Sequence, residues 1–248
     1  MPTVALTRDQ ELVPPFPGGR VFEQTMRPGL ADCAPSGRMR LDALARWIQD
    51  VAYADVEDAG VEGAAVWVVR RMRLRVTSFP RFADRCRVST FCSGLGAMWA
   101  ERRTTIAQAG SGRREVEAVA LWVHLDPELR RPTPLSQREL EVYGALGHNR
   151  RISARLRHPP PPDDVDGRDW RFRATDCDLA DHVNNAAYWQ PLEEELLAGA
   201  DPEEIDVEVE FRSPAQPGDA RFLAGGDSRW IAGADGEVYA SLRLVSRV

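Results

Sequence analysis

The sequence contains no lysine, so all 32 basic residues are arginine. We attribute this bias to a GC-rich genome and give it no functional weight. The chain also lacks an apolar run of the roughly 20 residues that cross a bilayer. Its first residues lack the basic-then-apolar order of a secretory signal. We therefore expect a cytoplasmic protein without a membrane span.

Cysteine is scarce: the four cysteines are Cys33, Cys86, Cys92 and Cys177, and they form no CxxC pair and no Cys/His spacing typical of zinc. We expect reduced thiols rather than a disulfide framework, with no metal and no cofactor. A net charge of -6 argues against a general nucleic-acid binder. With 248 residues, 43% of them hydrophobic, the chain can form one large domain or two small ones.

The first half reads as one strand, one long helix and an antiparallel meander. Leu41, Leu44 and Ile48 recur at helical spacing, and Gly60 is a stop signal, which predicts a helix over 40–58. Runs rich in β-forming residues, bounded by turn signals, then occupy 65–79, 84–95, 97–108 and 115–126.

The same order restarts after a short predicted helix at 136–147 and a proline-rich linker. The second half has a strand at 170–175, a predicted helix over 183–198, and further strand patterns at 205–214, 219–226, 229–234 and 238–248. Pro191 falls within the predicted second helix, where we expect a kink that alters an acyl tunnel or a tolerated local bend.

The sequences of the two halves align without a gap around their helix starts. The segment "ADCAPSGRMRLDALARWIQD" from Ala31 matches "TDCDLADHVNNAAYWQPLEE" from Thr175, a constant offset of 144 positions. We interpret this as an internal duplication. It predicts an α+β fold, a double hotdog with two tandem units, each a long helix wrapped by an antiparallel β-sheet. The expected organisation is an N-terminal extension over 1–19, a first unit over 20–135, a linker over 136–167 and a second unit over 168–248.

Polar residues before the second helix have no counterparts before the first. The second copy has Asp178, His182 and Asn184 where the first has Ala34, Arg38 and Arg40. If these residues only capped a helix, both copies would need equivalents, because every helix start exposes unpaired N–H groups. The asymmetry favours a functional site in the second copy. In the first copy, Ser36 or Asp32 is a possible cap. The alternative is that Asp178 is only a cap and His182 a packed, hydrogen-bonded histidine.

The stretch "TDCDLADHVNNAAY" resembles the "SDxDxNxHVNNxxY" hallmark of the acyl-acyl carrier protein thioesterases of plastids and bacteria. The first half is similar to the same family at "WVVRRMRLRVTSFPRFADRCRVSTF", "MWAERRTTI" and "ALWVHLDPELRRPTPL". The resemblance runs from about residue 20 to the C-terminus. It implies a hydrolase that releases a fatty acid from acyl carrier protein in fatty acid biosynthesis.

Carried over by position, the resemblance assigns the catalytic roles to Asp178, His182 and Asn184. The chain departs from the family at Ala180, where the family has asparagine, and at Pro214, which falls at or next to the family's catalytic glutamate. Each loss removes a polar partner, so a slower, re-specified or inactive enzyme is compatible with the sequence.

Two other carboxylates, Glu208 and Glu210, lie earlier on the strand that leads to Pro214. The sequence does not fix which face of the sheet they occupy relative to the site.

Thioester hydrolysis needs an activated water and a dipole that holds the developing oxyanion. A carboxylate before a helix can act as general base or nucleophile, and the helix start supplies N–H groups and positive potential. Asp178 stands at such a position. His182 could orient water or protonate the leaving thiolate, and Asn184 could position the aspartate or the substrate carbonyl.

The acyl chain is expected to lie mostly against the first half, which has the longer apolar strands. Its candidate walls are Trp47, Met72, Met98 and Trp99, unless these four are plain core residues.

Arginines gather in several short clusters, which could steer an acidic acyl carrier protein or the phosphates of coenzyme A. The clusters are Arg70, Arg71, Arg73 and Arg75; Arg102 and Arg103; Arg113 and Arg114; and Arg150, Arg151, Arg155 and Arg157. The alternative is that they are ordinary outward strand positions.

The expected partner is a thioester of acyl carrier protein or of coenzyme A, and the protein is expected to be a monomer or a homodimer. Two other functions stay open at this point. One is a non-catalytic acyl-binding or regulatory module, and the other is a dehydratase or hydratase of hydroxyacyl thioesters on the same fold.

Overall fold

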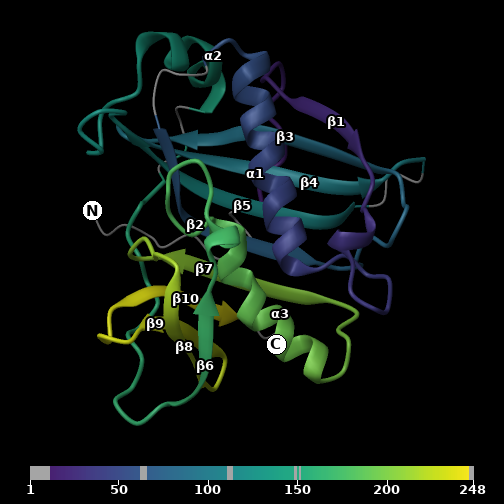
Figure 1. Cartoon of the computed structure of the whole chain (residues 1–248). Helices are drawn as coiled ribbons and strands as arrows, with labels where there is room; N and C mark the ends of the chain where they lie inside the picture. The colour runs from purple at the N-terminus through teal and green to yellow at the C-terminus, as the bar shows by residue number, and fades with distance from the viewer. Residues whose placement is uncertain (1–11, 62–65, 111–113, 148–149, 151, 246–248) are drawn as a thin grey trace.

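The computed structural model describes residues 12–61, 66–110, 114–147, 150 and 152–245 (Figure 1). Residues 1–11 of the expected N-terminal extension, and Arg113 and Arg151 of the arginine clusters, lie outside the described residues. None of the described helices is long and apolar enough to cross a membrane.

Among the residues that the structure describes, each half of the chain contains five strands and a central helical segment. The first half consists of β1 (Phe22–Met26), η2 (Leu30–Asp32), α1 (Leu41–Asp58), β2 (Val66–Val76), β3 (Cys86–Leu95), β4 (Trp99–Gln108) and β5 (Arg114–Leu125), followed by α2 (Gln137–Gly147). The second half consists of β6 (Asp166–Phe172), η3 (Ala174–Asp176), η4 (Asn185–Trp189), α3 (Gln190–Ala198), β7 (Ile205–Phe211), β8 (Gly218–Gly225), β9 (Ser228–Gly233) and β10 (Val238–Leu244). The strands predicted from the sequence periodicity are confirmed, with shifts at their ends.

The ten strands form one antiparallel sheet in the order β1-β3-β4-β5-β2-β7-β10-β9-β8-β6. Each half has the same internal order when its strands are numbered from its own start. The two halves are joined by β2 and β7, which pair antiparallel with Met72 opposite Val209 and Leu74 opposite Val207. The duplication inferred from the offset of 144 residues therefore appears as two related halves of a continuous sheet.

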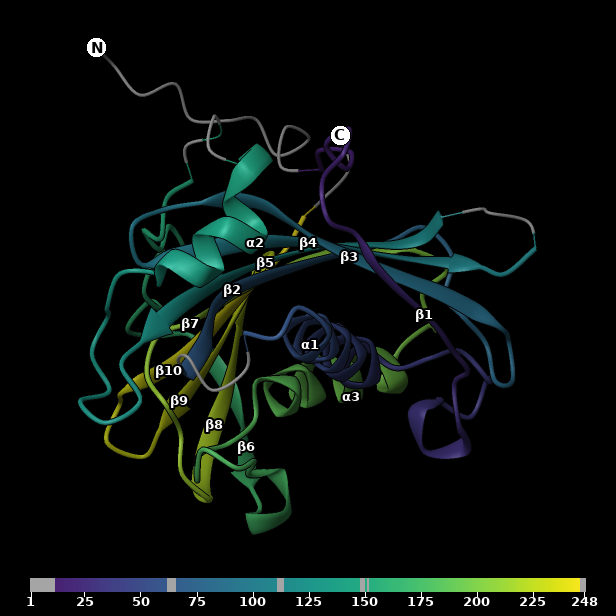
Figure 2. The same cartoon turned by 90° about the horizontal axis from the view of Figure 1, so that it is seen from above.

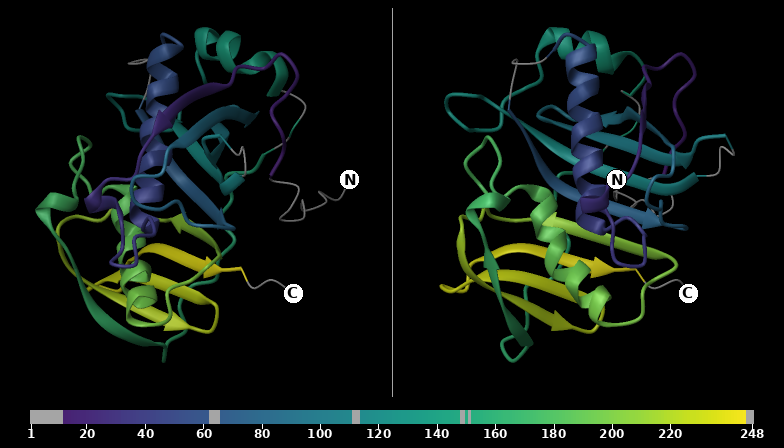
Figure 3. Two further views of the ribbon diagram at one scale, coloured as in Figure 1. Left: turned by 90° about the vertical axis from the view of Figure 1, so that its right-hand side faces the viewer. Right: turned by 45° about the vertical axis from the view of Figure 1, so that its right-hand side comes forward.

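The sheet curves around α1 and α3, which lie side by side against its concave face (Figures 2 and 3). One hydrophobic core connects the two halves and contains residues from α1, η4, β2 and β7. Leu41, Leu44, Ile48 and Val51 of α1 are fully or almost fully buried in it. Because these residues repeat every three or four positions, one stripe of the helix meets the sheet, as the sequence pattern predicted.

The second helical segment differs from the prediction of a long helix over 183–198. It begins as the 3-10 turn η4 and continues as the nine-residue α3. Pro191 lies in the first turn of α3 rather than in its interior. Proline lacks an N–H, so it fits where no intrahelical donor is needed and the α-helix begins next to it. The expected kink within a long helix is therefore wrong.

The outer face of the β2–β7 junction is charged, and its charges are paired. Arg73 binds Asp206 through two hydrogen bonds of 2.8 and 2.7 Å. Arg71 lies 3.8 Å from a carboxylate oxygen of Glu208. Arg71 and Arg73 are each only 4% exposed. Arg71 and Arg73 therefore join the two halves instead of forming a carrier-binding surface, which corrects that interpretation for these two members of the cluster.

The arginines of β4 are also buried and paired. Arg103 forms an ion pair with Glu117, and Arg102 forms one with Asp55 of α1. They too are removed from the expected surface for an acidic carrier.

Candidate active site

The loop between β6 and η4 is a tight turn held by its own backbone. Cys177 and Val183 form an isolated antiparallel bridge. Inside it, the Asp178 amide donates to the His182 carbonyl at 3.1 Å. Asp181 has a φ of 60°, in the left-handed region that aspartate tolerates better than most residues. The turn thereby presents Asp178 at its exposed tip.

The carboxylate of Asp178 is held by two hydrogen bonds. Its Oδ1 accepts from the Ala180 amide at 2.8 Å, and its Oδ2 accepts from Nδ2 of Asn184 at 2.8 Å. Asn184 is the N-cap of η4, because its Oδ1 accepts from the Ala186 amide at 2.8 Å. Asn184, and not Asp178, therefore caps the helical segment, and the interpretation of Asp178 as a simple cap is wrong.

The backbone amides at the start of η4 already have acceptors. Ala186 donates to the Asn184 side chain, and Ala187 donates to the Asn184 carbonyl at 2.9 Å. These two amides are consequently occupied, and the oxyanion-binding role that the sequence suggests for the helix start does not fall to them.

The first half contributes a side chain to this site that the sequence interpretation missed. Gln49 of α1 donates through Nε2 to Oδ1 of Asn184 at 2.9 Å. Its Oε1 accepts from Nδ2 of Asn185 at 3.2 Å. No local motif marks Gln49, since it lies 135 residues before Asn184. The sequence signal that could have pointed to Gln49 is its position, because the constant offset of 144 makes it equivalent to Glu193 on the second helix.

A cavity of about 640 Å³ opens beside the turn. Asp178, Leu179, Ala180 and Asn184 line one side of it. The other described lining residues all precede residue 144, and include Gln49, Tyr53 and Val56 of α1 and Trp67, Ala100 and Trp122 of the sheet. A mostly apolar cavity thus meets the polar turn at Asp178 and Asn184.

One buried ionic group interrupts the apolar lining. Arg102 is paired with Asp55, and the guanidinium lies 5.4 Å from the centre of the Tyr143 ring. The Tyr143 hydroxyl donates to the same Asp55 carboxylate at 3.2 Å. Burial, more than any other effect, raises the pKa of Tyr143 to about 12, so this hydroxyl remains a donor at neutral pH.

His182 lies close to this group in sequence but is not among the residues that line the cavity. It is half-buried, and within the described part of the chain its side chain has no hydrogen bond, while its carbonyl accepts from Asp178. Its catalytic role stays a prediction.

The predicted acyl-chain walls do not line the cavity. Trp47 and Met72 belong to the buried core. Met98 and Trp99 are half-buried, and the Trp99 indole donates to the carbonyl of Ile152 in the linker at 3.4 Å. The position of these four residues gives no support to a substrate-binding role.

The segment around Pro214 packs against the turn, but without a carboxylate. Pro214 itself is exposed. The Ala215 amide donates to the Tyr188 hydroxyl at 2.9 Å, and Gln216 donates through its amide to the Asp181 carbonyl at 2.9 Å. From this segment, the side chain of Gln216 therefore binds the turn, and its contact is with the backbone carbonyl of Asp181.

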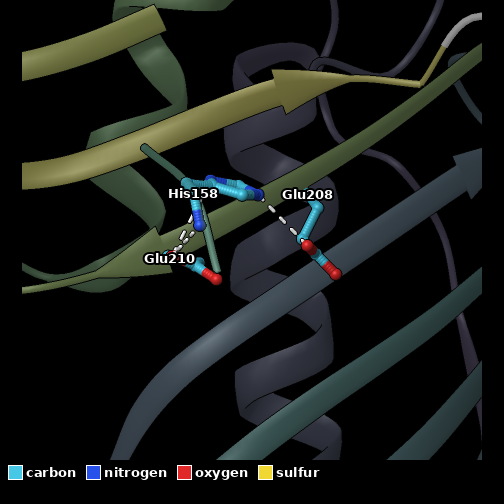
Figure 4. Close-up of side chains that lie close together, drawn as sticks. All are labelled: His158, Glu208 and Glu210. Atoms are coloured by element: carbon cyan, nitrogen blue, oxygen red, sulfur yellow. Dashed lines mark hydrogen bonds and ion pairs between the residues drawn. The ribbon is translucent and has the colours of Figure 1, made fainter. Parts of the chain in front are cut away.

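Glu208 and Glu210 lie on the opposite face of the sheet from the cavity, around His158 of the linker (Figure 4). The three residues hold metal-binding atoms within 4.8 Å of one another. Glu210, however, accepts from the His158 amide at 3.0 Å and from Arg212 at 3.3 Å. His158 Nε2 lies 3.1 Å from Glu208. Because protein donors already occupy Glu210, the cluster serves to hold the linker on the sheet.

Cys177 stands next to the aspartate but is not activated. Partial burial, and then the charges of Asp181, Asp176 and Asp178, raise the pKa of its thiol. A thiol with a raised pKa carries little thiolate at neutral pH and is a poor nucleophile.

The equivalent site of the first copy is closed by a buried ion pair. Arg38 lies 2.8 Å from a carboxylate oxygen of Glu193, and both side chains are almost fully buried. The other oxygen of Glu193 accepts from the Leu41 amide at 2.9 Å. The sequence interpretation proposed Ser36 or Asp32 as the cap of α1, but neither side chain caps this helix. Instead, Glu193 from α3 accepts from Leu41, the first residue of α1.

Comparison with known proteins identifies the family. The model of the acyl-ACP thioesterase N-terminal domain matches residues 19–143, and that of the acyl-ACP thioesterase C-terminal domain matches residues 161–221. An uncharacterised protein of Mycobacterium tuberculosis is 27% identical over 215 residues, covering 85% of this chain and 84% of its own.

Relatives of lower sequence identity include proteins that are named as thioesterases. The chloroplastic oleoyl-acyl carrier protein thioesterase 2 of Arabidopsis thaliana is 22% identical over 206 residues, covering 72% of this chain and 55% of its own. The solved structure of a 12:0-ACP thioesterase from Umbellularia californica superimposes with a TM-score of 0.74 at 19% identity, over 92% of this chain and 97% of that one. With family models matching both halves, the chain belongs to the acyl-ACP thioesterase family and is a thioester hydrolase.

Proposed function

We propose that the protein hydrolyses a fatty acyl thioester to a free fatty acid and a thiol, with Asp178 activating the attacking water. The observation that carries the proposal is the position of the Asp178 carboxylate. It is fixed by Asn184 at 2.8 Å and faces a cavity whose remaining walls are mostly apolar. An acyl chain in the cavity brings its thioester carbonyl to the polar turn.

In the reaction, water attacks the carbonyl carbon and transfers a proton to Asp178. The tetrahedral intermediate then collapses, the carbon–sulfur bond breaks, and the proton returns to the leaving thiolate. Asn184 keeps the carboxylate oriented toward the water. His182 assists by orienting the water or by passing the proton from Asp178 to the thiolate.

The carrier is proposed to be acyl carrier protein, as in the names of the plastid relatives, with an acyl-coenzyme A thioester as the alternative. Arg46 and Arg130 line the cavity among the described residues. Arg130, and Arg46 in addition to its ion pair with Asp32, supply positive charge for a phosphopantetheine phosphate, which both carriers share.

The test is steady-state hydrolysis of long-chain acyl-carrier and acyl-coenzyme A thioesters by wild type and Asp178→Asn. We expect the variant to lose about 10²-fold or more in rate while remaining folded, as is typical of a lost general base. Asp181→Asn is the matched control in the same turn, because asparagine also tolerates a positive φ. Equal rates in wild type and Asp178→Asn would remove Asp178 from the mechanism.

A second variant tests the departure from the family pattern. Ala180 lines the cavity beside Asp178, so Ala180→Asn restores a polar side chain there. We expect its rate to equal or exceed that of wild type. The absence of turnover above background in every variant would instead favour a non-catalytic acyl-binding module.

A further inference from the structure

The orientation of the Asn184 side-chain amide decides whether Asn184 donates a hydrogen bond to the Asp178 carboxylate. An asparagine side chain presents an acceptor oxygen on one side and two donor hydrogens on the other. In this site Oδ1 receives the Ala186 amide at 2.8 Å and the Gln49 amide at 2.9 Å, while Nδ2 donates to Asp178 at 2.8 Å. Turned over, the amide would set donor against donor and oxygen against carboxylate.

Gln49 is itself fixed in one orientation. Because Oδ1 of Asn184 is the acceptor of the Ala186 amide, Gln49 turns its donor Nε2 toward it, and its Oε1 then accepts from Nδ2 of Asn185 at 3.2 Å. The hydrogen bonds run in one direction, from Asn185 through Gln49 and Asn184 to Asp178. Asp178 and Asn184 come from the turn of the second half and Asn185 from the start of η4, whereas Gln49 comes from α1 of the first half.

We propose that Gln49 is a positioning residue for hydrolysis: together with the Ala186 amide, it holds Oδ1 of Asn184 so that Nδ2 donates to Asp178. The inference rests on the proposed role of Asp178 as the base. Gln49 acts through Asn184 and does not need to touch the reacting atoms. Gln49 of the first half thus reaches across the interface between the two halves and completes the active site of the second half.

The chemistry of position 49 requires an amide rather than a carboxylate. At the equivalent position of the second half, Glu193 accepts from the Leu41 amide and pairs with Arg38. A glutamate at 49 could accept from Asn185 but could not donate to Oδ1 of Asn184. It would draw the Asn184 amide into the reversed orientation and place a second negative charge near Asp178.

The experiment compares wild type with Gln49→Met, Gln49→Glu and the control Glu57→Gln. Glu57 lies about two turns beyond Gln49 on the same helix, is exposed and does not line the cavity. In Gln49→Met we expect kcat to fall about three- to tenfold with little change in KM, because one neutral hydrogen bond is lost. In Gln49→Glu we expect a larger fall, and the acid limb of the pH–rate profile should move to higher pH, because a like charge disfavours the ionised carboxylate. Glu57→Gln should keep the kcat of wild type.

Two kinetic outcomes would overturn the proposal. One is a wild-type kcat and pH profile in folded Gln49→Glu. The other is an equal loss in Gln49→Met and Gln49→Glu with unchanged pH profiles, which a purely structural role would give. A wild type without turnover, or an Asp178→Asn protein with full activity, would contradict the proposed function instead.

The hydrogen-bond chain is testable without turnover. In ¹⁵N NMR spectra, the side-chain amide of Asn184 should exchange slowly with solvent in wild type and faster in Gln49→Met. Unchanged exchange in Gln49→Met would overturn the proposal whatever the activity.

Discussion

Gln49 and Glu193 occupy equivalent positions on the two central helices, 144 residues apart, and each binds the start of the other helical segment. Gln49 binds Asn184 at the start of η4, and Glu193 binds the Leu41 amide at the start of α1. The crossing contact between Gln49 and Asn184 lies at a polar site that is open to the cavity. The other is filled by the buried pair of Glu193 and Arg38, so under the proposed function one crossing serves catalysis and the other serves the structure.

Asn184→Ala should impair both catalysis and the cap. The variant loses the donor to Asp178 and the acceptor for the Ala186 amide. We expect kcat to fall about tenfold or more, and stability to fall by about 1 kcal/mol, the usual cost of a lost cap. Asn184→Asp restores the acceptor but not the donor, so it should recover thermal stability without recovering kcat. Recovery of both would show that the bond to Asp178 does not matter.

Glu193→Gln should destabilise the fold by about 3 kcal/mol, since it neutralises the buried carboxylate beside Arg38 and leaves the partly exposed Asp201 to pair with the guanidinium. The matched control is Glu194→Gln, one residue on. Glu194 pairs with Arg168 at 3.1 Å in a solvent-exposed position, where such pairs contribute about 0–1 kcal/mol. Urea unfolding measures both. Similar losses in the two variants would contradict a structural role that is specific to the buried pair.

Ala100→Leu should lower activity on long acyl chains more than on short ones. Ala100 lines the cavity and is almost fully buried, so a larger side chain takes up volume there. Met98→Ala, two residues earlier and outside the lining, should leave the chain-length profile unchanged. A profile that changes in Met98→Ala and not in Ala100→Leu would restore the walls inferred from the sequence.

Cys177 should be dispensable and slow to react. Burial and three neighbouring carboxylates raise the pKa of its thiol, which lowers the fraction of thiolate available to an alkylating reagent. We expect Cys177→Ser to retain wild-type kcat and iodoacetamide to inactivate wild type only slowly at pH 7. Rapid inactivation that is absent in Cys177→Ser would show a reactive thiol beside the site.

Stability should decline at alkaline pH partly through Tyr188. Burial raises the pKa of Tyr188 to about 12, above the value of about 10 in an unfolded chain. Between these values the unfolded state loses its phenolic proton first, so the free energy of unfolding falls as pH rises from about 10 toward 12. Below pH 10 this contribution is fully present.

Thermal unfolding from pH 8 to 11.5 provides the measurement for Tyr188. Tyr188→Phe should be less stable at pH 8, because the Ala215 amide loses its acceptor. Its melting temperature should nevertheless decline less steeply above pH 10. A parallel decline in the two proteins would assign the alkaline transition to other groups.

The sequence alone determined the strands, the long helix α1, the duplication and the family, because alternating and helical periodicities are local and the offset of 144 residues has no gaps. It also selected Asp178 and Asn184, whose spacing in one turn brings them together. It could not determine which strand face is covered, so Arg71, Arg73 and Arg102 were taken for surface residues although the structure buries and pairs them. The cavity walls and Gln49 were likewise decided by tertiary structure, because they depend on how α1 of one half packs against the turn of the other, 135 residues away.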